Sequence, residues 1–174
     1  NVMRRILQAT GAEVIHLGHN RSVADIVDAA LQEDVQAIAV SSYQGGHVEY
    51  LKYMVDMLRE RGGEQIRVFA GGGGVIVPEE IEELHNYGVA RIYSPEDGQT
   101  MGLQGMILDM LEKSEFDPGE LAPTSLEPIT KGDFRALSRL LTAMENGTLS
   151  KDFHAAVSQA AKSVEKRIPV LGIT

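Results

Sequence analysis

The chain has 174 residues, with 16 basic and 25 acidic side chains and a net charge of −9 at pH 7. This balance argues against a nucleic-acid binder, because neutralising phosphates requires clustered Lys and Arg. The lack of cysteine excludes disulfides, thiolate-bound zinc, iron–sulfur clusters and a cysteine nucleophile. With 43% hydrophobic residues and no apolar run near the roughly 18 residues of a membrane span, the composition predicts a globular, cytoplasmic protein.

Residues 1–113 alternate short apolar runs with longer amphipathic segments, a pattern typical of βα units that build a parallel sheet. Strands are expected at residues 13–17, 35–41, 66–70 and 89–93. Helices are expected at residues 2–9, 22–33, 47–61, 78–87 and 99–111. A helix therefore comes before any strand, whereas a doubly wound sheet normally begins with a strand. We expect the first strand of this domain to precede Asn1, and the residue at position 1 is not Met.

The composition changes after residue 113. Residues 114–130 hold three prolines and show no periodicity, which predicts a linker. A helical connector is expected over residues 131–167, with helices at 133–145 and 151–166. Residues 168–174 form a new apolar run, and we expect there the first strand of a following domain.

Four consecutive glycines, Gly71 to Gly74, follow one predicted strand and precede a predicted helix. Glycine lets a backbone approach a bulky ligand closely, although a flexible turn is the alternative interpretation. The run does not fit the dinucleotide fingerprint G-x-G-x-x-G, because Ile76 or Val77 stands where the last glycine is required. The sequence therefore disfavours a nicotinamide or flavin dinucleotide at this loop.

Two hydroxyl side chains, Ser41 and Ser42, end the strand predicted at residues 35–41, which has the clearest strand pattern in the chain. Open α/β sheets bind their ligands at the carboxyl ends of strands. A serine there can hydrogen-bond a ligand or cap the next turn, and the sequence leaves both roles open.

The histidines do not form a metal set in the sequence. His16 and His19 lack an acidic or thiol partner at ligand spacing, and His47 and His85 are expected to be structural. No nucleophile, base and orienting group come together, so the chain alone is not expected to be catalytic.

Residues 11–14, 39–47, 71–78 and 88–95 together resemble the cobalamin-binding domain of adenosylcobalamin-dependent acyl-CoA mutases. The resemblance is greatest to the fused isobutyryl-CoA mutases. It implies a flavodoxin-like α/β fold, here a doubly wound parallel sheet lacking its first strand. It also implies that the nucleotide tail of the cofactor lies in the crevice at the carboxyl ends of the strands.

By this resemblance Ser41 would hydrogen-bond the base of the tail, and Tyr43 would line its pocket where the family usually has Leu. The implied cofactor-binding residues are Ser41, Ser42, Tyr43, Gly71, Gly72, Gly73, Gly74, Tyr93, Ser94 and Pro95. The cobalt ligand of the family is a histidine in an Asp-x-His-x-x-Gly motif. That motif does not occur in the 174 residues, so the ligand is expected upstream of Asn1.

The resemblance further implies a parent isomerase that rearranges a short acyl-CoA. Its substrate-binding barrel domain would lie elsewhere in the polypeptide, a GTPase domain that binds GTP and magnesium would follow this chain, and the parent would be a homodimer. A flavodoxin-like FMN-binding module, or a partner-binding module without cobalamin, is the alternative. Against FMN, the chain has no Trp and only 5% aromatic residues to stack on a flavin.

Overall fold

The computed structural model describes residues 2–164, and the chain divides into two compact units, Asn1–Phe116 and Asp117–Thr174. The strand expected at residues 168–174 lies outside the described residues. Across residues 2–164 no helix combines the length and the apolar character that crossing a membrane requires.

The first unit is built on a parallel sheet of three strands in the order β1-β2-β3. These are β1 (Ala37–Ser41), β2 (Arg67–Gly71) and β3 (Arg91–Tyr93). Their carboxyl ends are in register, since Ser41 pairs with Gly71 and Gly71 pairs with Tyr93. The three strands, which lie far apart in the sequence, therefore end side by side at one edge of the sheet.

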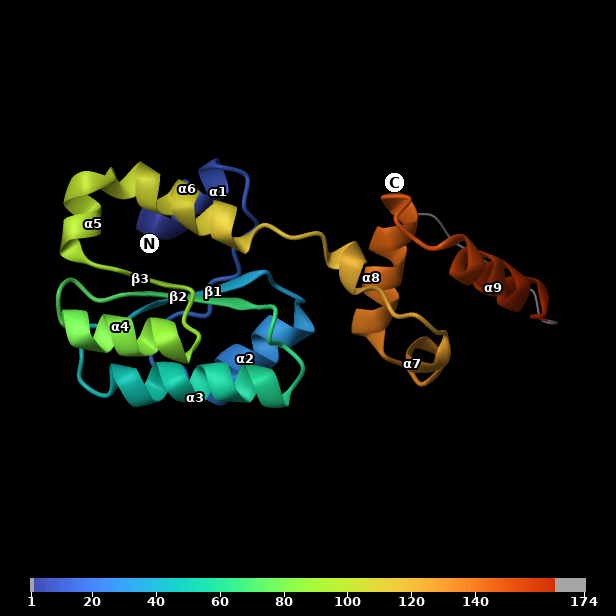
Figure 1. Cartoon of the computed structure of the whole chain (residues 1–174), viewed down its shortest axis with the longest axis horizontal. Coiled ribbons are helices and arrows are strands. Elements are labelled where there is room, and N and C mark those ends of the chain that lie inside the picture. The colour runs from blue at the N-terminus through green and yellow to red at the C-terminus, as the bar shows by residue number, and fades with distance from the viewer. Residues whose placement is uncertain (1, 165–174) are drawn as a thin grey trace. The chain divides into compact units, whose positions relative to one another are not determined.

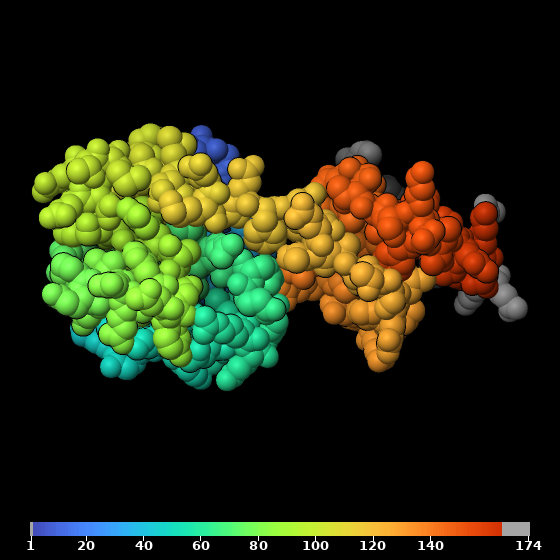
Figure 2. Space-filling model, in the orientation of Figure 1, coloured from blue at the N-terminus to red at the C-terminus, as the bar shows by residue number. Residues whose placement is uncertain are grey.

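Helices cover both faces of this sheet (Figure 1). One face carries α2 (Val23–Gln32), α3 (His47–Glu60) and α4 (Pro78–Tyr87); the other carries α1 (Val2–Ala9) and α6 (Gly102–Ser114). The larger core lies on the α3 side, where Leu51, Met54 and Leu84 are almost completely buried. Figure 2 shows, from the same direction, that side chains fill the space between the ribbons. The doubly wound α/β fold expected from the sequence is confirmed.

Local signals set the starts of the helices. The Ser22 hydroxyl accepts the Asp25 backbone N–H at 3.1 Å, and the Asp25 carboxylate accepts the Ser22 N–H at 3.4 Å. This capping box begins α2, as the sequence predicts. Pro78 opens α4, where its fixed φ suits the first helical turn.

Two sequence predictions in this unit are wrong. Residues 13–17 form no strand, because within residues 2–164 no backbone pairs with them and a strand requires a hydrogen-bonded neighbour. The single helix expected at residues 99–111 is instead two, α5 (Pro95–Thr100) and α6, because Ser94 and Pro95 start a helix earlier. The two helices meet at Gly102, whose φ of +64° interrupts regular helix.

The second unit is helical in the described residues. It contains η1 (Pro118–Leu121), α7 (Glu127–Thr130), α8 (Phe134–Glu145) and α9 (Lys151–Lys162). Residues 114–130, the predicted linker, include a 3₁₀ helix and a short α-helix. η1 packs on α8, and the Asn146 amide donates to the Asp117 carboxylate at 3.0 Å.

Candidate functional site

The carboxyl edge of the sheet brings the sequence-predicted site residues together. Ser41, Gly71 and Tyr93 stand in one row, and the other predicted residues follow directly: Ser42, Tyr43 and Gly72 to Gly74 in two loops, Ser94 as the single link after β3, and Pro95 as the first residue of α5. These loops lead into α3, α4 and α5. Because ligands of open α/β sheets bind at this edge, the arrangement makes it the candidate binding site.

Strand β1 presents small side chains on one of its faces. Ile38 and Val40 point toward the α3 side, whereas Ala39 and Ser41 alternate with them and are exposed. Ala39 pairs in register with Phe69, which is buried against α6. On the face opposite α3, large side chains therefore cover the sheet at β2, whereas the sheet surface at β1 is open. We call the exposed face of Ala39 and Ser41 the open strip.

The two serines differ in what they bond. No group among residues 2–164 forms a hydrogen bond with the Ser41 hydroxyl, so it is free for a ligand. The Ser42 N–H donates to the Gly71 carbonyl at 2.9 Å, and its hydroxyl donates to the Gln44 carbonyl at 3.4 Å. Ser42 thus holds the turn, and Ser41 carries the available hydroxyl.

The four-glycine loop is shaped by close contacts rather than by flexibility. A Cβ on Gly72 would lie 2.3 Å from the Ser42 carbonyl oxygen, and one on Gly73 would lie 2.8 Å from the Tyr43 ring. Gly73 and Gly74 also have φ values of +57° and +91°, which side chains disfavour. The Tyr43 ring itself is 69% exposed, so it offers an aromatic face beside the glycines.

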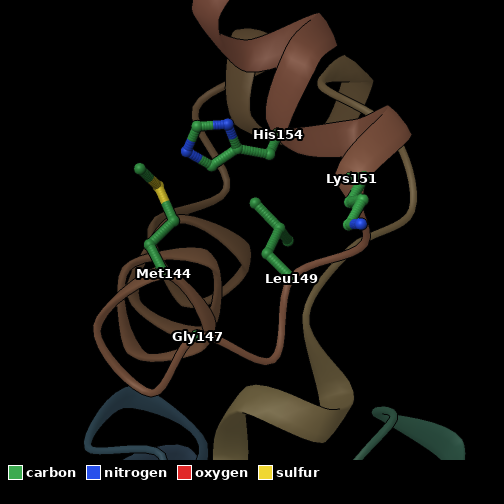
Figure 3. A pocket seen from close by; sticks show the side chains of 5 residues that line it. All are labelled: Met144, Gly147, Leu149, Lys151 and His154. Atoms are coloured by element: carbon green, nitrogen blue, oxygen red, sulfur yellow. The ribbon is translucent and has the colours of Figure 1, made fainter.

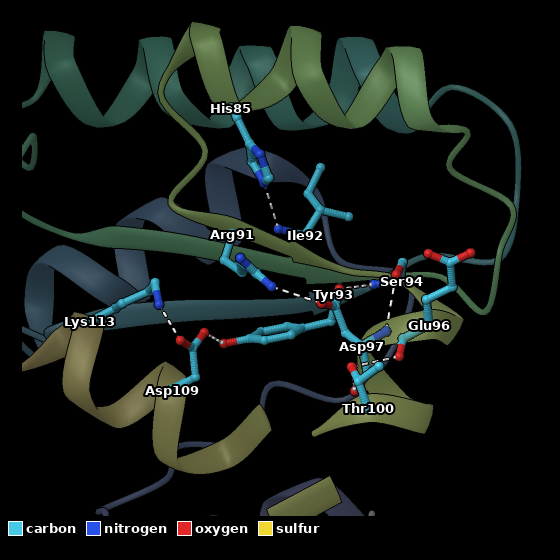
Figure 4. Close-up of polar contacts among 10 residues, drawn as sticks. All are labelled: His85, Arg91, Ile92, Tyr93, Ser94, Glu96, Asp97, Thr100, Asp109 and Lys113. Atoms are coloured by element: carbon cyan, nitrogen blue, oxygen red, sulfur yellow. Dashed lines mark hydrogen bonds and ion pairs between the residues drawn. The ribbon is translucent and has the colours of Figure 1, made fainter. Parts of the chain in front are cut away.

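Tyr93 ends β3 with its side chain turned toward α6 (Figure 4). Its hydroxyl donates to the Asp109 carboxylate at 2.9 Å, and its ring stacks on Phe69 with a centroid distance of 6.4 Å. Burial, and then the hydrogen bond to Asp109, raise the pKa of the Tyr93 phenol. The phenol therefore joins β3 to α6 and is not available to a ligand.

Ser94 and Pro95 begin α5. The Ser94 hydroxyl accepts the Asp97 N–H at 3.2 Å, and the Asp97 carboxylate accepts the Ser94 N–H and an Arg91 N–H, both at 2.8 Å. Burial alone would raise the pKa of Asp97, but the hydrogen bonds from Ser94 and the Arg91 charge outweigh it and lower the pKa. This ionised carboxylate fixes the third loop (Figure 4).

His85 lies on α4 and supports β3 from the other side. Its Nε2 accepts the Ile92 backbone N–H at 3.0 Å, which requires a ring nitrogen without a proton (Figure 4). Burial, followed by the Arg91 charge, lowers the pKa of His85 and keeps the ring neutral. The expected structural role of this histidine follows from its geometry.

His47 opens α3 and is only 7% exposed. Its Nδ1 lies 3.1 Å from the Gln44 carbonyl and its Nε2 lies 2.9 Å from the Glu80 carboxylate. The hydrogen bond with Glu80, then that with Gln44, raise the pKa of His47. His16 and His19 are exposed, and no cluster able to hold a metal ion occurs among residues 2–164.

A separate hollow of about 390 Å³ lies in the second unit, between the end of α8 and the start of α9 (Figure 3). Met144, Leu149 and His154 line it. None of the sequence-predicted site residues belongs to it.

Two features of the candidate site were not predicted from the sequence. The alternation of Ala37, Ala39 and Ser41 with Ile38 and Val40 is visible in the sequence as a period of two, and it marks the open strip. The pairing of His47 with Glu80 is not visible, because the two residues lie 33 positions apart and meet only in the fold.

The chain is similar to known proteins along its whole length. Residues 1–103 match the B12 binding domain family. The chain is 64% identical over its whole length to the fused isobutyryl-CoA mutase of Cupriavidus metallidurans, and 59% identical to that of Geobacillus kaustophilus. It spans 16% of the length of each of these two relatives.

A smaller protein also matches. The chain is 32% identical over 91 residues to the 2-hydroxyisobutanoyl-CoA mutase small subunit of Aquincola tertiaricarbonis. The aligned region covers 52% of this chain and 65% of that subunit. The family match spans the three strands and every predicted site residue. The chain belongs to the B12 binding domain family.

Proposed function

We propose that the chain holds the nucleotide tail of adenosylcobalamin at the carboxyl edge of its sheet, as the cofactor-binding part of an acyl-CoA mutase such as isobutyryl-CoA mutase. The observation that carries this proposal is the open strip on β1, which ends at the unpartnered Ser41 hydroxyl. The likeness to fused isobutyryl-CoA mutases over the whole chain supports the assignment to a mutase.

The residues at the edge fit a flat aromatic base. Such a group needs small side chains to lie against and a few polar atoms to orient it. Ala39 and Ser41 leave the sheet surface open, and the glycine loop contributes backbone without side chains. The exposed Tyr43 ring provides a face for stacking or apolar contact.

In this proposal some residues contact the cofactor and others hold the site loops in place. Ser41 hydrogen-bonds the base, Gly71 to Gly74 and Tyr43 shape its pocket, and Pro95 borders it beside Gly74. The side chains of Ser42, Tyr93 and Ser94 act indirectly by holding the three loops in place. Cobalamin, when bound, supplies the radical chemistry, and this chain supplies binding and orientation.

In this proposal the histidine that would bind cobalt lies outside the 174 residues. Both ring nitrogens of His47 and the Nε2 of His85 are already hydrogen-bonded within the fold. His16 and His19 are exposed on an irregular segment between α1 and α2, and no metal-ligating cluster occurs among the described residues.

The partners of the site belong to the same parent polypeptide in this proposal. A substrate-binding barrel would bind the acyl-CoA, and a GTPase domain with GTP and magnesium would follow this chain. The parent would act as a cytoplasmic homodimer. The length of the fused relatives, of which this chain covers 16%, leaves room for both domains.

Substitution at Gly73 tests the proposed site. A leucine there meets the Tyr43 ring and displaces it from its place beside the glycines, so cobalamin affinity in the full-length protein should fall by orders of magnitude. Gly147→Leu is the matched control, because Gly147 has a similar φ of +67° and open space around it but lies in the second unit. Affinity is measured by spectroscopic titration with adenosylcobalamin, and circular dichroism checks folding.

Ser41→Ala should have a smaller effect. It removes one hydrogen bond to the base, which costs about 0.5–1.5 kcal/mol and lowers affinity by roughly tenfold at most. Equal affinity of the unaltered protein and the Gly73→Leu variant would show that the glycine loop is only a turn and that the tail binds elsewhere.

A further inference from the structure

A continuous chain of hydrogen bonds joins the first two site loops on the side away from the open strip. It runs from the Gln44 carbonyl to His47 Nδ1, and from His47 Nε2 to the Glu80 carboxylate. The same Glu80 oxygen accepts the Val77 backbone N–H at 3.0 Å. Gln44 lies in the loop that carries Tyr43, and Val77 ends the loop that contains the glycines. We call this set of contacts the His47 clamp.

The clamp closes a pair of loops that also meet at the cofactor side. The Ser42 N–H bonds the Gly71 carbonyl at 2.9 Å, and Tyr43 packs on Gly73 so closely that a Cβ there would lie 2.8 Å from the ring. Any change in the spacing of the two loops at the clamp therefore moves Tyr43 relative to the glycines.

The partners of His47 require both ring nitrogens to donate. A backbone carbonyl only accepts, and an ionised carboxylate only accepts, whereas a neutral imidazole has a single N–H. Both bonds of the clamp thus exist together only in the imidazolium form. The raised pKa of His47 and the lowered pKa of Glu80, each due first to the bond between them, agree with this geometry.

Other charges surround the clamp in an open hollow of about 450 Å³. Glu49 and Lys52 face it from α3, and Glu80 and Glu83 face it from α4. Lys52 pairs with Glu83, which leaves Glu49 as the further carboxylate that favours the imidazolium. The hollow contains no residue of the predicted cofactor set, so a substitution at the clamp changes no direct contact with the cofactor.

We propose that His47 is a positioning residue for cobalamin: its bridge between Gln44 and Glu80 sets the spacing of the Tyr43 loop and the glycine loop, and opening the bridge weakens binding of the nucleotide tail. This inference rests on the proposed function. It adds that affinity is greatest while His47 is protonated, because the clamp loses one bond when the ring becomes neutral. Affinity therefore falls as the pH rises through the raised pKa of His47.

Two matched pairs of variants of the full-length protein test the clamp. His47→Leu removes both bonds and keeps apolar bulk, whereas His47→Gln retains an amide N–H that can reach Glu80 and does not titrate. Glu80→Gln weakens the acceptor from the other side. Glu79→Gln makes the same charge change on the neighbouring, exposed residue and is the control. Each protein is titrated with adenosylcobalamin at pH 6 and pH 9, and its melting temperature is recorded.

In the unaltered protein and in Glu79→Gln, Kd should rise about tenfold from pH 6 to pH 9, the effect of losing one charge-assisted bond. His47→Leu and Glu80→Gln should bind about tenfold more weakly at pH 6 and lose that pH dependence. His47→Gln should recover part of the affinity with a flat profile. A purely structural role would lower the melting temperature of the variants and leave the pH dependence of Kd in place.

The outcomes separate the two proposals. Equal Kd values and equal pH profiles in the unaltered protein, His47→Leu and Glu80→Gln would overturn the role of His47 alone. Failure of the unaltered protein to bind adenosylcobalamin would overturn the proposed function, and this inference with it.

Discussion

Gly72 lies tightly against the backbone of the neighbouring site loop. A methyl group there would lie 2.3 Å from the Ser42 carbonyl oxygen, and only a backbone shift could relieve the clash. We expect Gly72→Ala to lower the free energy of unfolding by about 1–3 kcal/mol, as overpacked sites do. Gly45→Ala, in the neighbouring loop with nothing within 4 Å, should leave stability unchanged or slightly raised. Urea unfolding measures both, and equal stabilities would show that the loops can move apart freely.

His85 makes stability depend on pH because its folded state favours the neutral ring. Its pKa is lowered below the usual 6.5 by burial and by Arg91. The contribution of His85 to the free energy of unfolding is therefore present above pH 6.5, and it is lost as the pH falls through and below that value. His47 has the opposite sign, since its raised pKa gives a contribution present below pH 6.5 and lost as the pH rises.

Urea unfolding between pH 8 and pH 5 separates these effects. The amide carbonyl of His85→Gln can accept the Ile92 N–H without titrating, so its stability should fall less on acidification than that of the unaltered chain. His154→Gln, at an exposed position on α9, should keep the original slope. An unchanged slope in His85→Gln would contradict the neutral acceptor role of His85.

At the scale of elements, Tyr93 joins the last strand to α6 through Asp109. Tyr93→Phe keeps the stacking on Phe69 but removes a hydrogen bond to a charged group, which typically costs about 1.5–3 kcal/mol. We expect a loss of that size in the free energy of unfolding. Tyr53→Phe, at a 56% exposed position, should have no measurable effect. If the two variants prove equally stable, the Tyr93–Asp109 bond contributes nothing to the packing of α6.

The sequence predicted the elements that carry their own signals. The apolar runs around Ile38 and Val68 gave β1 and β2, the capping box of Ser22 gave α2, and Pro78 gave the start of α4. The strand expected at residues 13–17 failed because strand formation depends on a partner and not on the segment alone. The break between α5 and α6 was not predicted, because the positive φ of Gly102 is not visible in the sequence.

The meeting of the candidate site residues at one edge of the sheet could be predicted from the sequence, but the role of each side chain could not. The strand-end rule located Ser41, the glycines and Tyr93 at one edge. It could not tell that Tyr93 points toward Asp109 or that Ser94 caps α5, because both depend on side-chain direction. The flavin alternative, open from the sequence, finds no support in the match to the B12 binding domain family.

At the scale of the whole molecule, the two units differ in which known proteins they match. The family match ends at residue 103, within the first unit, whereas the fused mutases match the chain through its full length. The fused relatives therefore match the second unit as well, although it lies outside the family match. Its connecting role toward a GTPase domain stays a prediction.

Nucleotide binding is not expected of the chain itself. The sequence contains no G-x-x-x-x-G-K-[ST], so the backbone cradle and the lysine that hold nucleotide phosphates are missing. Calorimetric titration of residues 1–174 with GTP and magnesium should give no binding heat. Micromolar binding would contradict this reading of the second unit.

The central claim is that the carboxyl edge of the sheet holds the cobalamin tail, and hydrogen–deuterium exchange of the full-length protein tests it most directly. Adenosylcobalamin should slow exchange in the peptides that contain residues 41–46, 71–77 and 93–98, because the three loops lose solvent contact and mobility on binding. The peptides of α8 and α9 should exchange equally with and without the cofactor. Protection that spares all three loops while the cofactor is bound would contradict the account.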